Sequence, residues 1–498
     1  MGRNQNAGVL AANRGKLLTR RSLLQRAGWA IAAAAFPYRA GMATESISPV
    51  MAKLSTYMSE ARGHTLPDEV VEKAKHHILD TLAAMVSGSE LPGGRAAIRF
   101  ARAYGGENIA TVVASHILCG PIEAALANGT LAHSDETDDT HGLANAHLGA
   151  AIVPAALALG EQFGNDGMQF LRAVVLGYDI GPRVAMTLSI TASQRGSKDI
   201  HGVAGVFGAA AAASCAASLN TQQMRWVLDY TAQQSSGIEG LIFRGPDHTE
   251  KAFASAGMPA RSGVTAALLV QSGWVGVDDI LSGSNNLFLT YAPQADPEGL
   301  IDKLGERYEV TRTDIKKWTV GAPAQSPLDA MEILLQRHPF EAEQVKQVIV
   351  RLANRGVISV SNHDMPDICL QHLIAMMLID KTVSFRSVHD KPRMQDPAIL
   401  RQRAKVTLVP DEELDHLLPK RVAIVEVTLA DGSHLTERVD AVRGTAENPM
   451  TRDEVVAKCR NLMTPVLGTG ASTNLIETVL GLDNAKDIRE LRPLLQHT

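Results

Sequence analysis

The spacing of apolar residues along this chain changes from helical to strand-like near Ile315. From Ser48 to about Leu300, apolar side chains recur at the spacing of an α-helix, and few segments alternate as strands do. The apolar runs are rich in alanine and glycine, which favours closely packed helices over a β-sandwich. The sequence therefore predicts an all-α first domain.

Several helices can be placed within that region. Pro67 is followed by Asp68 and Glu69, and acidic residues in the first turn favour the start of a helix. The apolar spacing predicts further helices over residues 131–140, 150–163, 169–186, 203–219 and 261–272.

Strand-like alternation dominates the region after Ile315. Residues 345–352 and 405–409 alternate apolar and polar side chains, as half-buried strands do. Residues 421–442 hold two more such runs, and the Asp431-Gly432 pair between them is a strong signal for a hairpin turn. We therefore expect antiparallel strands here.

Helices are interspersed with these strands, at residues 327–337 and 367–380, so the region is predicted to form an α+β domain. A helical pattern resumes at Asn448 and continues to the end of the chain. We expect this last segment to pack back on the first domain.

Composition excludes several classes of protein. Of the 498 residues, 45% are hydrophobic and 20% charged, which is ordinary for a globular protein with a sizeable core. A net charge of −5, 4% aromatic residues and the lack of a basic block argue against a nucleic-acid partner. The chain has four cysteines, Cys119, Cys215, Cys369 and Cys459, and no two of them form a C-x-x-C pair, which excludes a zinc ribbon. We expect Cys215 to be a buried free thiol.

The first 43 residues have the features of an export signal. Residues 19–25 (TRRSLLQ) match a twin-arginine motif, an apolar stretch follows, and residues 41–43 (GMA) form a small-x-small cleavage pattern. The apolar stretch is too short to span a bilayer, and no later segment has the pattern of a membrane span. The prediction is a periplasmic protein that begins near Thr44; the alternative is a chance Arg pair and a cytoplasmic protein.

Residues 131–149 (LAHSDETDDTHGLANAHLG) hold a dense group of titratable side chains among small apolar residues. Burying an unpaired charge is costly, so such a group of titratable side chains indicates a functional role. If the helix predicted here continues through the acidic run, His133, Glu136 and Thr140 lie on one face. That face presents a base, a carboxylate and a hydroxyl to one ligand.

Three interpretations of this segment compete. It can be a solvated, acidic helix end. It can be a metal site, since His and Asp at short spacing suit divalent cations. Against a metal, there is no H-E-x-x-H or H-x-H, and the best pair, His133 and Asp138, has no dedicated third ligand. It can also be a metal-free acid–base site in which carboxylate and imidazole pKa values are tuned apart.

Residues 136–141 (ETDDTH) followed by His147 resemble the D-x-D-D-T-H…H-P segment of the MmgE/PrpD family. That family includes 2-methylcitrate dehydratase, cis-aconitate decarboxylase and iminodisuccinate epimerase. Similar segments follow the family's order along the chain, from about residue 48 to the C-terminus: 66–88, 177–184, 201–214, 250–269, 316–330 and 444–458.

The resemblance implies a fold, an assembly and a type of chemistry. It implies an MmgE/PrpD-like all-helical domain over residues 44–306 and 445–498, with a smaller α+β lid domain over 307–444. It also implies a homodimer that acts on a small carboxylate without a metal or an organic cofactor. Composition predicts no nucleic-acid partner, and the lack of a later membrane-span pattern predicts no membrane association after removal of the signal.

The resemblance also implies site residues. Thr140 and His147 match the family's site threonine and histidine, and His201 matches its central histidine. Lys251 matches the site lysine, although the distance in sequence from Lys251 to Gly257 is one residue longer than in the commoner form of the family's motif. A second lysine at the edge of the lid domain is matched by Lys317 or, alternatively, by its neighbour at position 316.

Three positions depart from the family's pattern. Glu136 stands where dehydratases and decarboxylases carry Asp, and its extra methylene displaces the carboxylate. Gln325 replaces a His and cannot titrate, whereas His372 replaces a Tyr and adds a group that titrates near neutral pH. We therefore expect a substrate that differs from those of the characterised members.

The prediction for function is a cofactor-independent lyase or isomerase that abstracts a proton next to a carboxylate of a small di- or tricarboxylate. The alternatives are a non-catalytic periplasmic carboxylate-binding protein of the same fold and a divalent-metal hydrolase. The predicted roles are Glu136 or His201 as base, His372 or His147 as proton donor, Lys251 and Lys317 as carboxylate clamps, Thr140 positioning the substrate, and Gln325 in the substrate-binding site.

Overall fold

The computed structural model describes residues 46–188, 198–238, 245 and 247–496. The predicted export signal, residues 1–43, lies outside the described residues. No described helix is both long enough and apolar enough to cross a membrane. The four cysteines are buried and unpaired, as predicted for Cys215.

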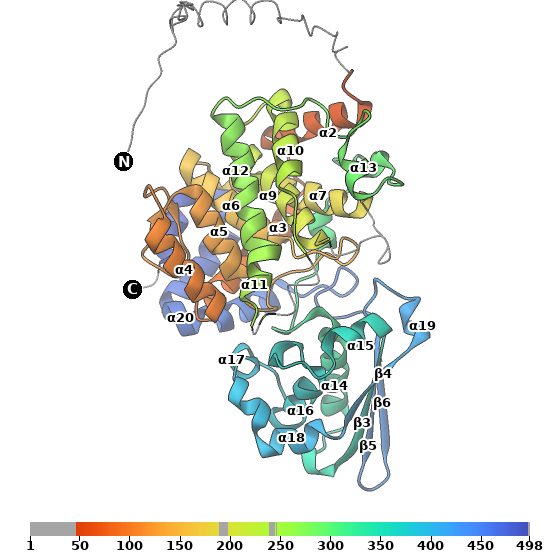
Figure 1. Cartoon of the computed structure of the whole chain (residues 1–498). Helices are drawn as coiled ribbons and strands as arrows, with labels where there is room; N and C mark the ends of the chain where they lie inside the picture. Colours follow the sequence, from red (N-terminus) through yellow and green to blue (C-terminus); the bar gives the residue numbers. More distant parts are fainter. Residues whose placement is uncertain (1–45, 189–197, 239–244, 246, 497–498) are drawn as a thin grey trace, which may run out of the picture. The chain divides into compact units, whose positions relative to one another are not determined.

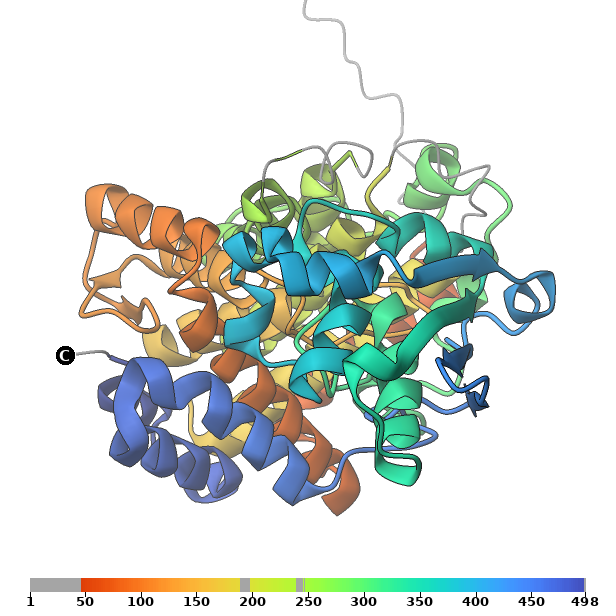
Figure 2. The same ribbon diagram turned by 90° about the horizontal axis from the view of Figure 1, so that it is seen from below.

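Helices dominate the described chain up to Leu300 and again after Met450 (Figures 1 and 2). The first group comprises α2 (Pro49–Glu60), α3 (Asp68–Gly88), α4 (Pro92–Tyr104), α5 (Pro121–Ala132), α6 (Gly149–Phe163), α7 (Gly167–Thr187), α9 (Ile200–Ala216), α10 (Thr221–Gln234), α11 (Thr249–Ala252), α12 (Met258–Gln271) and α13 (Leu287–Tyr291). The second comprises α20 (Arg452–Leu480) and α21 (Arg492–Leu495).

These two groups share one hydrophobic core, which joins residues from Val50 to Ile315 with residues from Met450 to Leu495. Helix α20 packs on α3, and Figure 2 shows the C-terminal helices beside the N-terminal ones. The expectation that the last segment packs back on the first is confirmed. The only strands that the structure describes in this helical region are β1 (Ala110–Thr111) and β2 (Leu118–Cys119), which pair with each other and have two residues each.

Small residues bring the central helices close together. Helix α7 packs on α9, where a Cβ on Gly177 would lie 2.8 Å from the Gly208 carbonyl oxygen. A Cβ on Gly181 would lie 2.6 Å from the carbonyl oxygen of Ala204. Only glycine fits at such contacts, because a real Cβ cannot approach a backbone atom so closely. The alanine- and glycine-rich runs therefore act as predicted.

The region after Ile315 builds a second hydrophobic core, from Trp318 to Val442. Its helices are α14 (Gln325–Arg337), α15 (Asn354–Val360), α16 (Leu370–Asp380), α17 (Phe385–Val388), α18 (Pro397–Arg403) and α19 (Glu412–Asp415). Its strands are β3 (Val345–Leu352), β4 (Val406–Pro410), β5 (Ala423–Leu429) and β6 (His434–Val439), in the order β4-β3-β5-β6. In Figure 1, α14 and α16 lie on one side of this sheet.

The prediction of an antiparallel sheet is wrong for one pair of strands. Strands β3 and β5, and β5 and β6, pair antiparallel, but β3 and β4 pair parallel. The chain between β3 and β4 includes helices α15 to α18, and a connection of that length lets a strand return in the same direction. The protein is thus mostly α-helical with a smaller α+β part. The domain boundaries and the lid function remain predictions.

The predicted helix over residues 131–140 is also wrong, because α5 ends at Ala132. His133 caps its C-terminus with φ −114° and ψ 23°, outside helical values. The Asp135 carboxylate accepts hydrogen bonds from the Thr137 amide at 2.9 Å and from its hydroxyl at 2.6 Å. Such local bonds compete with the helix, so residues 133–148 form an irregular segment and share no helical face.

Candidate active site

A cavity of about 720 Å³ is lined by residues of the helical core on one side and of the α+β part on the other. We call the first group the helical wall: Glu136, Thr140, Asn145, His147, His201 and Lys251. We call the second the α+β wall, whose side chains include Leu352, Arg355, Val360, His363, Arg421 and Val422. Sites of this size and mixed lining are typical of small-molecule binding.

Asp139 anchors the irregular segment that carries most of the helical wall. Its carboxylate accepts hydrogen bonds from Tyr178 Oη, from the Gly149 amide at 2.9 Å and from His77 Nδ1 at 2.8 Å. Burial would raise the pKa of Asp139, but the bond and charge of His77 outweigh burial and lower that pKa. Asp139 therefore has a structural role, tying the segment to α3, α6 and α7.

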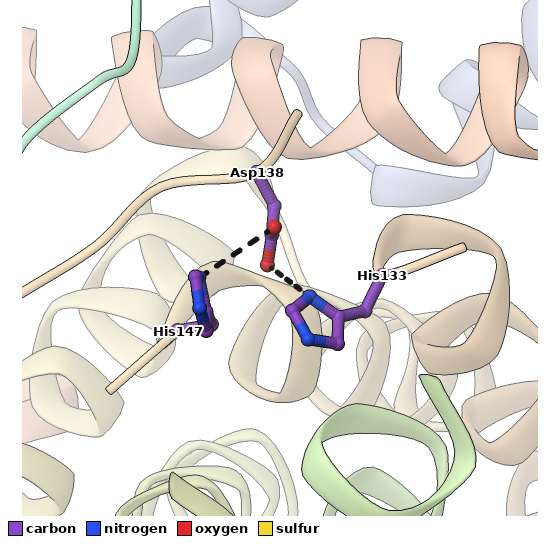
Figure 3. A group of neighbouring side chains, drawn as sticks. All are labelled: His133, Asp138 and His147. Atoms are coloured by element: carbon purple, nitrogen blue, oxygen red, sulfur yellow. Dashed lines mark hydrogen bonds and ion pairs between the residues drawn. The ribbon is translucent and has the colours of Figure 1, made fainter. Parts of the chain in front are cut away.

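Three imidazole rings lie close together on this wall. The ring centroids of His133 and His147 are 4.6 Å apart, and those of His147 and His201 are 5.5 Å apart in a stacked arrangement. Asp138 lies between His133 and His147 (Figure 3), with its Oδ2 2.9 Å from His133 Nδ1. Asn145 Nδ2 lies 3.3 Å from His201 Nε2 and can donate to it.

His147 is held in its neutral form. Its Nδ1 lies 2.9 Å from the Asp139 carbonyl oxygen, which can only accept, so Nδ1 carries the proton and Nε2 is left as an acceptor. Burial lowers the pKa of His147 well below 6.5, and the charge of Lys316 lowers it further. A neutral imidazole in a cavity is suited to take a proton from a substrate.

Glu136 and Lys251 form a buried ion pair at the centre of the site. Burial would raise the pKa of Glu136, but the charges of Lys251 and Lys316 hold it well below its ordinary value. Burial alone would lower the pKa of Lys251, but Glu136 outweighs burial and raises it. Glu136 is therefore ionised in this state, which makes it a weak base until the pair opens.

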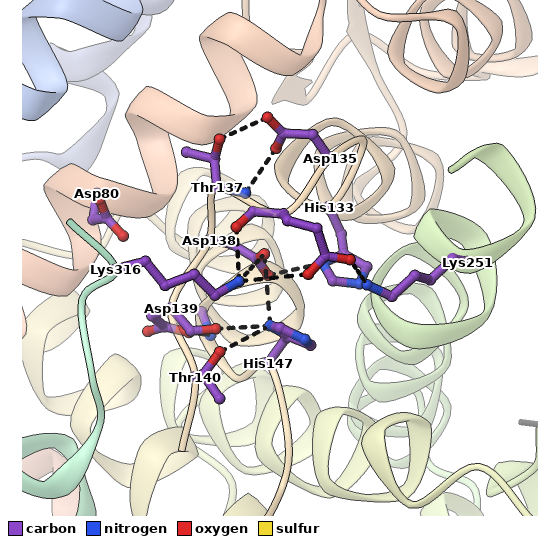
Figure 4. A network of polar contacts seen from close by, with 12 residues as sticks. Asp80, His133, Asp135, Thr137, Asp138, Asp139, Thr140, His147, Lys251 and Lys316 are labelled. Atoms are coloured by element: carbon purple, nitrogen blue, oxygen red, sulfur yellow. Dashed lines mark hydrogen bonds and ion pairs between the residues drawn. The ribbon is translucent and has the colours of Figure 1, made fainter. Parts of the chain in front are cut away.

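Lys316 approaches the same centre from the side opposite Lys251 (Figure 4). Its Nζ donates to the Glu136 carbonyl oxygen at 2.7 Å and lies 3.8 Å from Asp138 Oδ1. Burial lowers the pKa of Lys316, although Asp138 and Glu136 partly offset burial. The two lysines thus have pKa values shifted in opposite directions: that of Lys251 is raised and that of Lys316 is lowered.

A π-helical turn over Phe253–Gly257 begins two residues after Lys251. A turn of this kind holds one residue more than an α-helical turn, and such turns are frequent at functional sites. The extra residue falls within the stretch where the spacing from Lys251 to Gly257 exceeds the commoner form. A Cβ on Gly257 would lie 2.9 Å from the Leu126 carbonyl oxygen, so the turn keeps Gly257 tight against α5. The turn thus offers a physical reason for the longer spacing that the resemblance implies.

The structure brings together five of the residues predicted from the sequence, and they all line the cavity: Glu136, Thr140, His147, His201 and Lys251. It does not bring three others to this lining. His372 lies in α16 with 0% of its surface exposed, and burial lowers its pKa to about 4. Lys317 pairs with Glu332 and lies over the Trp318 ring. Gln325 bonds the backbone of Trp318 and Val320.

Two buried residues near Glu136, Lys316 and His248, were considered from the sequence but not selected as site residues. Lys316 was only the alternative to Lys317, yet it is the buried lysine of that pair. His248 Nε2 lies 2.9 Å from Asp367 Oδ2, and its Nδ1 lies 3.9 Å from Glu136 Oε1. Burial would lower the pKa of His248, but Asp367 outweighs burial and raises it. The closeness of His248 to Lys251 in sequence was the one available signal.

The structure also corrects the statement that His133 and Asp138 lack a third ligand. His133, Asp138 and His147 offer ligand atoms within 4.8 Å of one another, a group that can hold a metal ion (Figure 3). One feature opposes a divalent cation there. Lys316 Nζ lies 3.8 Å from Asp138 Oδ1, so the positive charge of its amine would repel the cation. The donor set therefore fits a proton-transfer network better than a metal centre.

Comparison with known proteins agrees with the resemblance. The profile of the MmgE/PrpD N-terminal domain matches residues 52–300, and that of the C-terminal domain matches residues 318–484. The chain belongs to the MmgE/PrpD family. Its family assignment thus rests on both halves of the chain, including each wall of the cavity.

Relatives within the family are similar over most of their length. A cis-aconitate decarboxylase-like protein of Aspergillus oryzae is 26% identical over 485 residues, covering 90% of this chain and 97% of that protein. Cis-aconitate decarboxylase of Aspergillus terreus is 23% identical over 483 residues, covering 90% and 96%. Human cis-aconitate decarboxylase is 25% identical over 454 residues, covering 87% and 92%.

Proposed function

We propose that this MmgE/PrpD-family protein is a lyase or isomerase that acts on a small di- or tricarboxylate through proton transfer next to a carboxylate, without a metal or organic cofactor. The relatives named cis-aconitate decarboxylase support a lyase-type enzyme at the level of the family. The observation that carries the proposal is the neutral His147 stacked on His201 in a cavity that also contains Lys251.

The chemistry requires a base, a proton donor and positive charge. The base takes the proton from a carbon next to a substrate carboxylate, and the C–H electron pair passes into that carboxylate as an enediolate. Protonation on the other face returns an epimer. Expulsion of a neighbouring hydroxyl, which takes a proton from the donor and leaves as water, gives a C=C bond. Positive charge beside the enediolate lowers the barrier for either outcome.

The helical wall supplies these roles. His147 and His201 are the proton-transfer pair, because both line the cavity and the Nδ1 proton of His147 leaves its Nε2 as an acceptor. Lys251 is the charged amine that holds the substrate carboxylate. A substrate carboxylate that pairs with Lys251 displaces Glu136, whose pKa then rises because the largest favourable charge on it is removed. Glu136 thereby becomes a second base only when substrate is bound.

The alternative of a non-catalytic carboxylate-binding protein rests on the departures from the family's pattern. Gln325 bonds only backbone groups of the α+β part, and His372 does not line the cavity. If those positions supplied an essential acid in other members, binding without turnover would result.

A screen of carboxylic acids tests the proposal. The purified protein is mixed in D₂O with citrate, 2-methylcitrate, cis-aconitate, malate and aspartate derivatives, and followed by proton NMR and thermal shift. Solvent deuterium on a carbon next to a carboxylate, or a new alkene signal, is the expected result. Thermal stabilisation by an acid, with no deuterium exchange and no product, would reject the enzyme proposal in favour of the carboxylate-binding protein. Turnover that chelators abolish and zinc restores would favour the metal hydrolase.

We also propose that the protein is exported, on the twin-arginine pattern of its first 43 residues. A reporter fused behind residues 1–60 should reach the periplasm. Lysine at both positions of the Arg20-Arg21 pair should retain the reporter in the cytoplasm. Export that is unchanged by these substitutions, or no export at all, would reject the proposed twin-arginine export and would leave the proposed enzyme function unaffected.

A further inference from the structure

The α+β wall carries an arginine that has no partner among the described residues. Arg421 lies just before β5, is partly buried and lines the cavity. Its guanidinium has no hydrogen bond or ion pair with any described residue. A guanidinium offers five N–H donors and stays charged, so leaving it unpaired inside a cavity is costly unless a ligand completes it.

A second arginine shares this wall. Arg355, from α15, lines the same cavity as Arg421. Burial lowers the pKa of Arg421, and the like charge of Arg355 lowers it further, while Asp314 and Glu136 oppose these effects. Two guanidinium groups on one wall of a cavity together attract an anion, and their planar geometry matches a carboxylate.

Much of the cavity surface is apolar. Its apolar lining includes Leu143, Leu352, Ile358, Val360, Leu418 and Val422. Enclosed cavities that bind drug-sized ligands measure about 300–1,000 Å³, so 720 Å³ is more than a four-carbon dicarboxylate fills. The cavity therefore offers a cation at the helical wall, apolar surface, and separate cations at the α+β wall.

We propose that Arg421, with Arg355, forms a second carboxylate subsite, which selects acids that carry a remote carboxylate beyond an apolar chain. This inference rests on the proposed function, since it places the reacting carboxylate at Lys251 and the remote one at Arg421. It makes the helical wall the site of proton transfer and the α+β wall the site that sets substrate length.

Binding of unreactive acids tests the subsite without requiring turnover. Succinate, glutarate, adipate and suberate are titrated calorimetrically into the wild-type protein and into Arg421→Gln, with hexanoate as the monocarboxylate probe. The longer diacids should bind the wild type more tightly than succinate does. Arg421→Gln should weaken them about tenfold to hundredfold, the usual range for a charged hydrogen bond, and should leave hexanoate binding unchanged.

Two further variants make this result specific. Arg421→Lys keeps the charge but not the planar fork, so it should lose less affinity than Arg421→Gln. Arg401→Gln removes an exposed arginine of α18 that does not line the cavity, and should bind every acid as the wild type does. Equal affinity of wild type and Arg421→Gln for adipate and suberate would overturn the subsite, and so would an equal loss of hexanoate binding.

The failure of the subsite and the failure of the proposed function can be told apart. Diacid binding that depends on Arg421, together with no deuterium exchange on any acid, keeps the subsite and rejects the enzyme. Exchange or turnover in the wild type, with an unchanged KM in Arg421→Gln, keeps the enzyme and rejects the subsite.

Discussion

The two walls of the cavity differ in how their charges are balanced. On the helical wall, the Glu136 carboxylate is paired with Lys251 and lies 3.7 Å from Lys316, so each charge is offset by a neighbour. On the α+β wall, Arg355 and Arg421 lie among apolar side chains, and Arg421 has no partner among the described residues. One wall is a polar network of paired charges, whereas the other includes a guanidinium, that of Arg421, with no hydrogen bond or ion pair to a described residue.

This difference separates two tasks. A network of closely paired charges and imidazoles shifts pKa values in opposite directions, as acid–base chemistry requires. An unpaired cation on an apolar surface recognises charge at a distance without moving protons. We therefore expect substitutions on the helical wall to change turnover or stability, and substitutions on the α+β wall to change affinity.

The largest effect is expected from His201→Ala. Removal of a group that transfers a proton lowers kcat by about 10²–10⁴-fold, while the fold is retained because His201 is only partly buried. His338→Ala, at an exposed position after α14, serves as the matched control and should keep wild-type turnover. Full activity in His201→Ala would remove the ring from the reaction and break the division between the walls.

Removal of one charge of the buried pair should cost stability. Glu136→Gln removes the carboxylate charge that faces the buried ammonium of Lys251, which is expected to lower the free energy of unfolding by about 3–5 kcal/mol. The double variant Glu136→Leu, Lys251→Met should regain much of that loss and remain inactive. Chemical denaturation measures both.

The exposed pair of Arg452 and Glu72 provides the control for this comparison. Arg452→Met should change the free energy of unfolding by about 0–1 kcal/mol, because water already screens that pair. A similarly small change in Glu136→Gln would mean that the central pair is solvated, and the contrast between the two walls would disappear.

His372 tests whether a titratable group outside both walls acts mainly on stability. Its pKa is lowered from 6.5 to about 4 by burial, so the unfolded chain binds a proton at a higher pH than the native protein does. Stability should therefore fall as the pH drops from 6.5 towards 4. His372→Leu should lose about 2–3 kcal/mol less than the wild type between pH 7 and pH 4.5.

Denaturant titrations at the two pH values measure that slope, with the exposed His338→Leu as control. An unchanged slope in His372→Leu would mean that the native ring is protonated at pH 4.5. A collapse of turnover in the same variant at neutral pH would support the proton-donor role predicted from the sequence.

The adjacent residues Lys316 and Lys317 test which of two neighbouring amines acts at the site. Lys316→Ala should lower kcat/KM by about tenfold to hundredfold, because its amine hydrogen-bonds the Glu136 carbonyl inside the site. Lys317→Ala should have the smaller effect, because that amine pairs with Glu332 instead. The reverse order in steady-state assays would restore Lys317 as the carboxylate clamp.

Local sequence signals predicted much of the fold and failed where the outcome depends on distant or competing contacts. The Asp431-Gly432 turn and the helical spacing of 150–163 and 169–186 act locally, and the structure has these elements. Alternation cannot reveal whether β4 runs parallel to β3, since this depends on the long connection between them. The helix through residue 140 failed because the hydrogen bonds of Asp135 stop it.

For the site, too, local sequence signals predicted the residues of a short motif but not those placed by distant contacts. The helical wall was predictable because Glu136, Thr140 and His147 lie in one short motif. Lys316 and Lys317 are adjacent in sequence, and only the packing of the segment decides which amine is buried. Arg421 stands at the start of an ordinary strand, and its place in the cavity depends on how the α+β part folds around β5.

The central claim is that one wall transfers protons and the other sets affinity. The most direct test is the rate of deuterium incorporation or turnover with the best acid from the screen, measured by NMR across substrate concentrations for wild type, His201→Ala and Arg421→Gln. We expect His201→Ala to remain slow at saturating acid, and Arg421→Gln to approach the wild-type rate once the acid is raised to overcome its higher KM. A lowered kcat with unchanged KM in Arg421→Gln, or recovery of His201→Ala at high acid, would contradict the account.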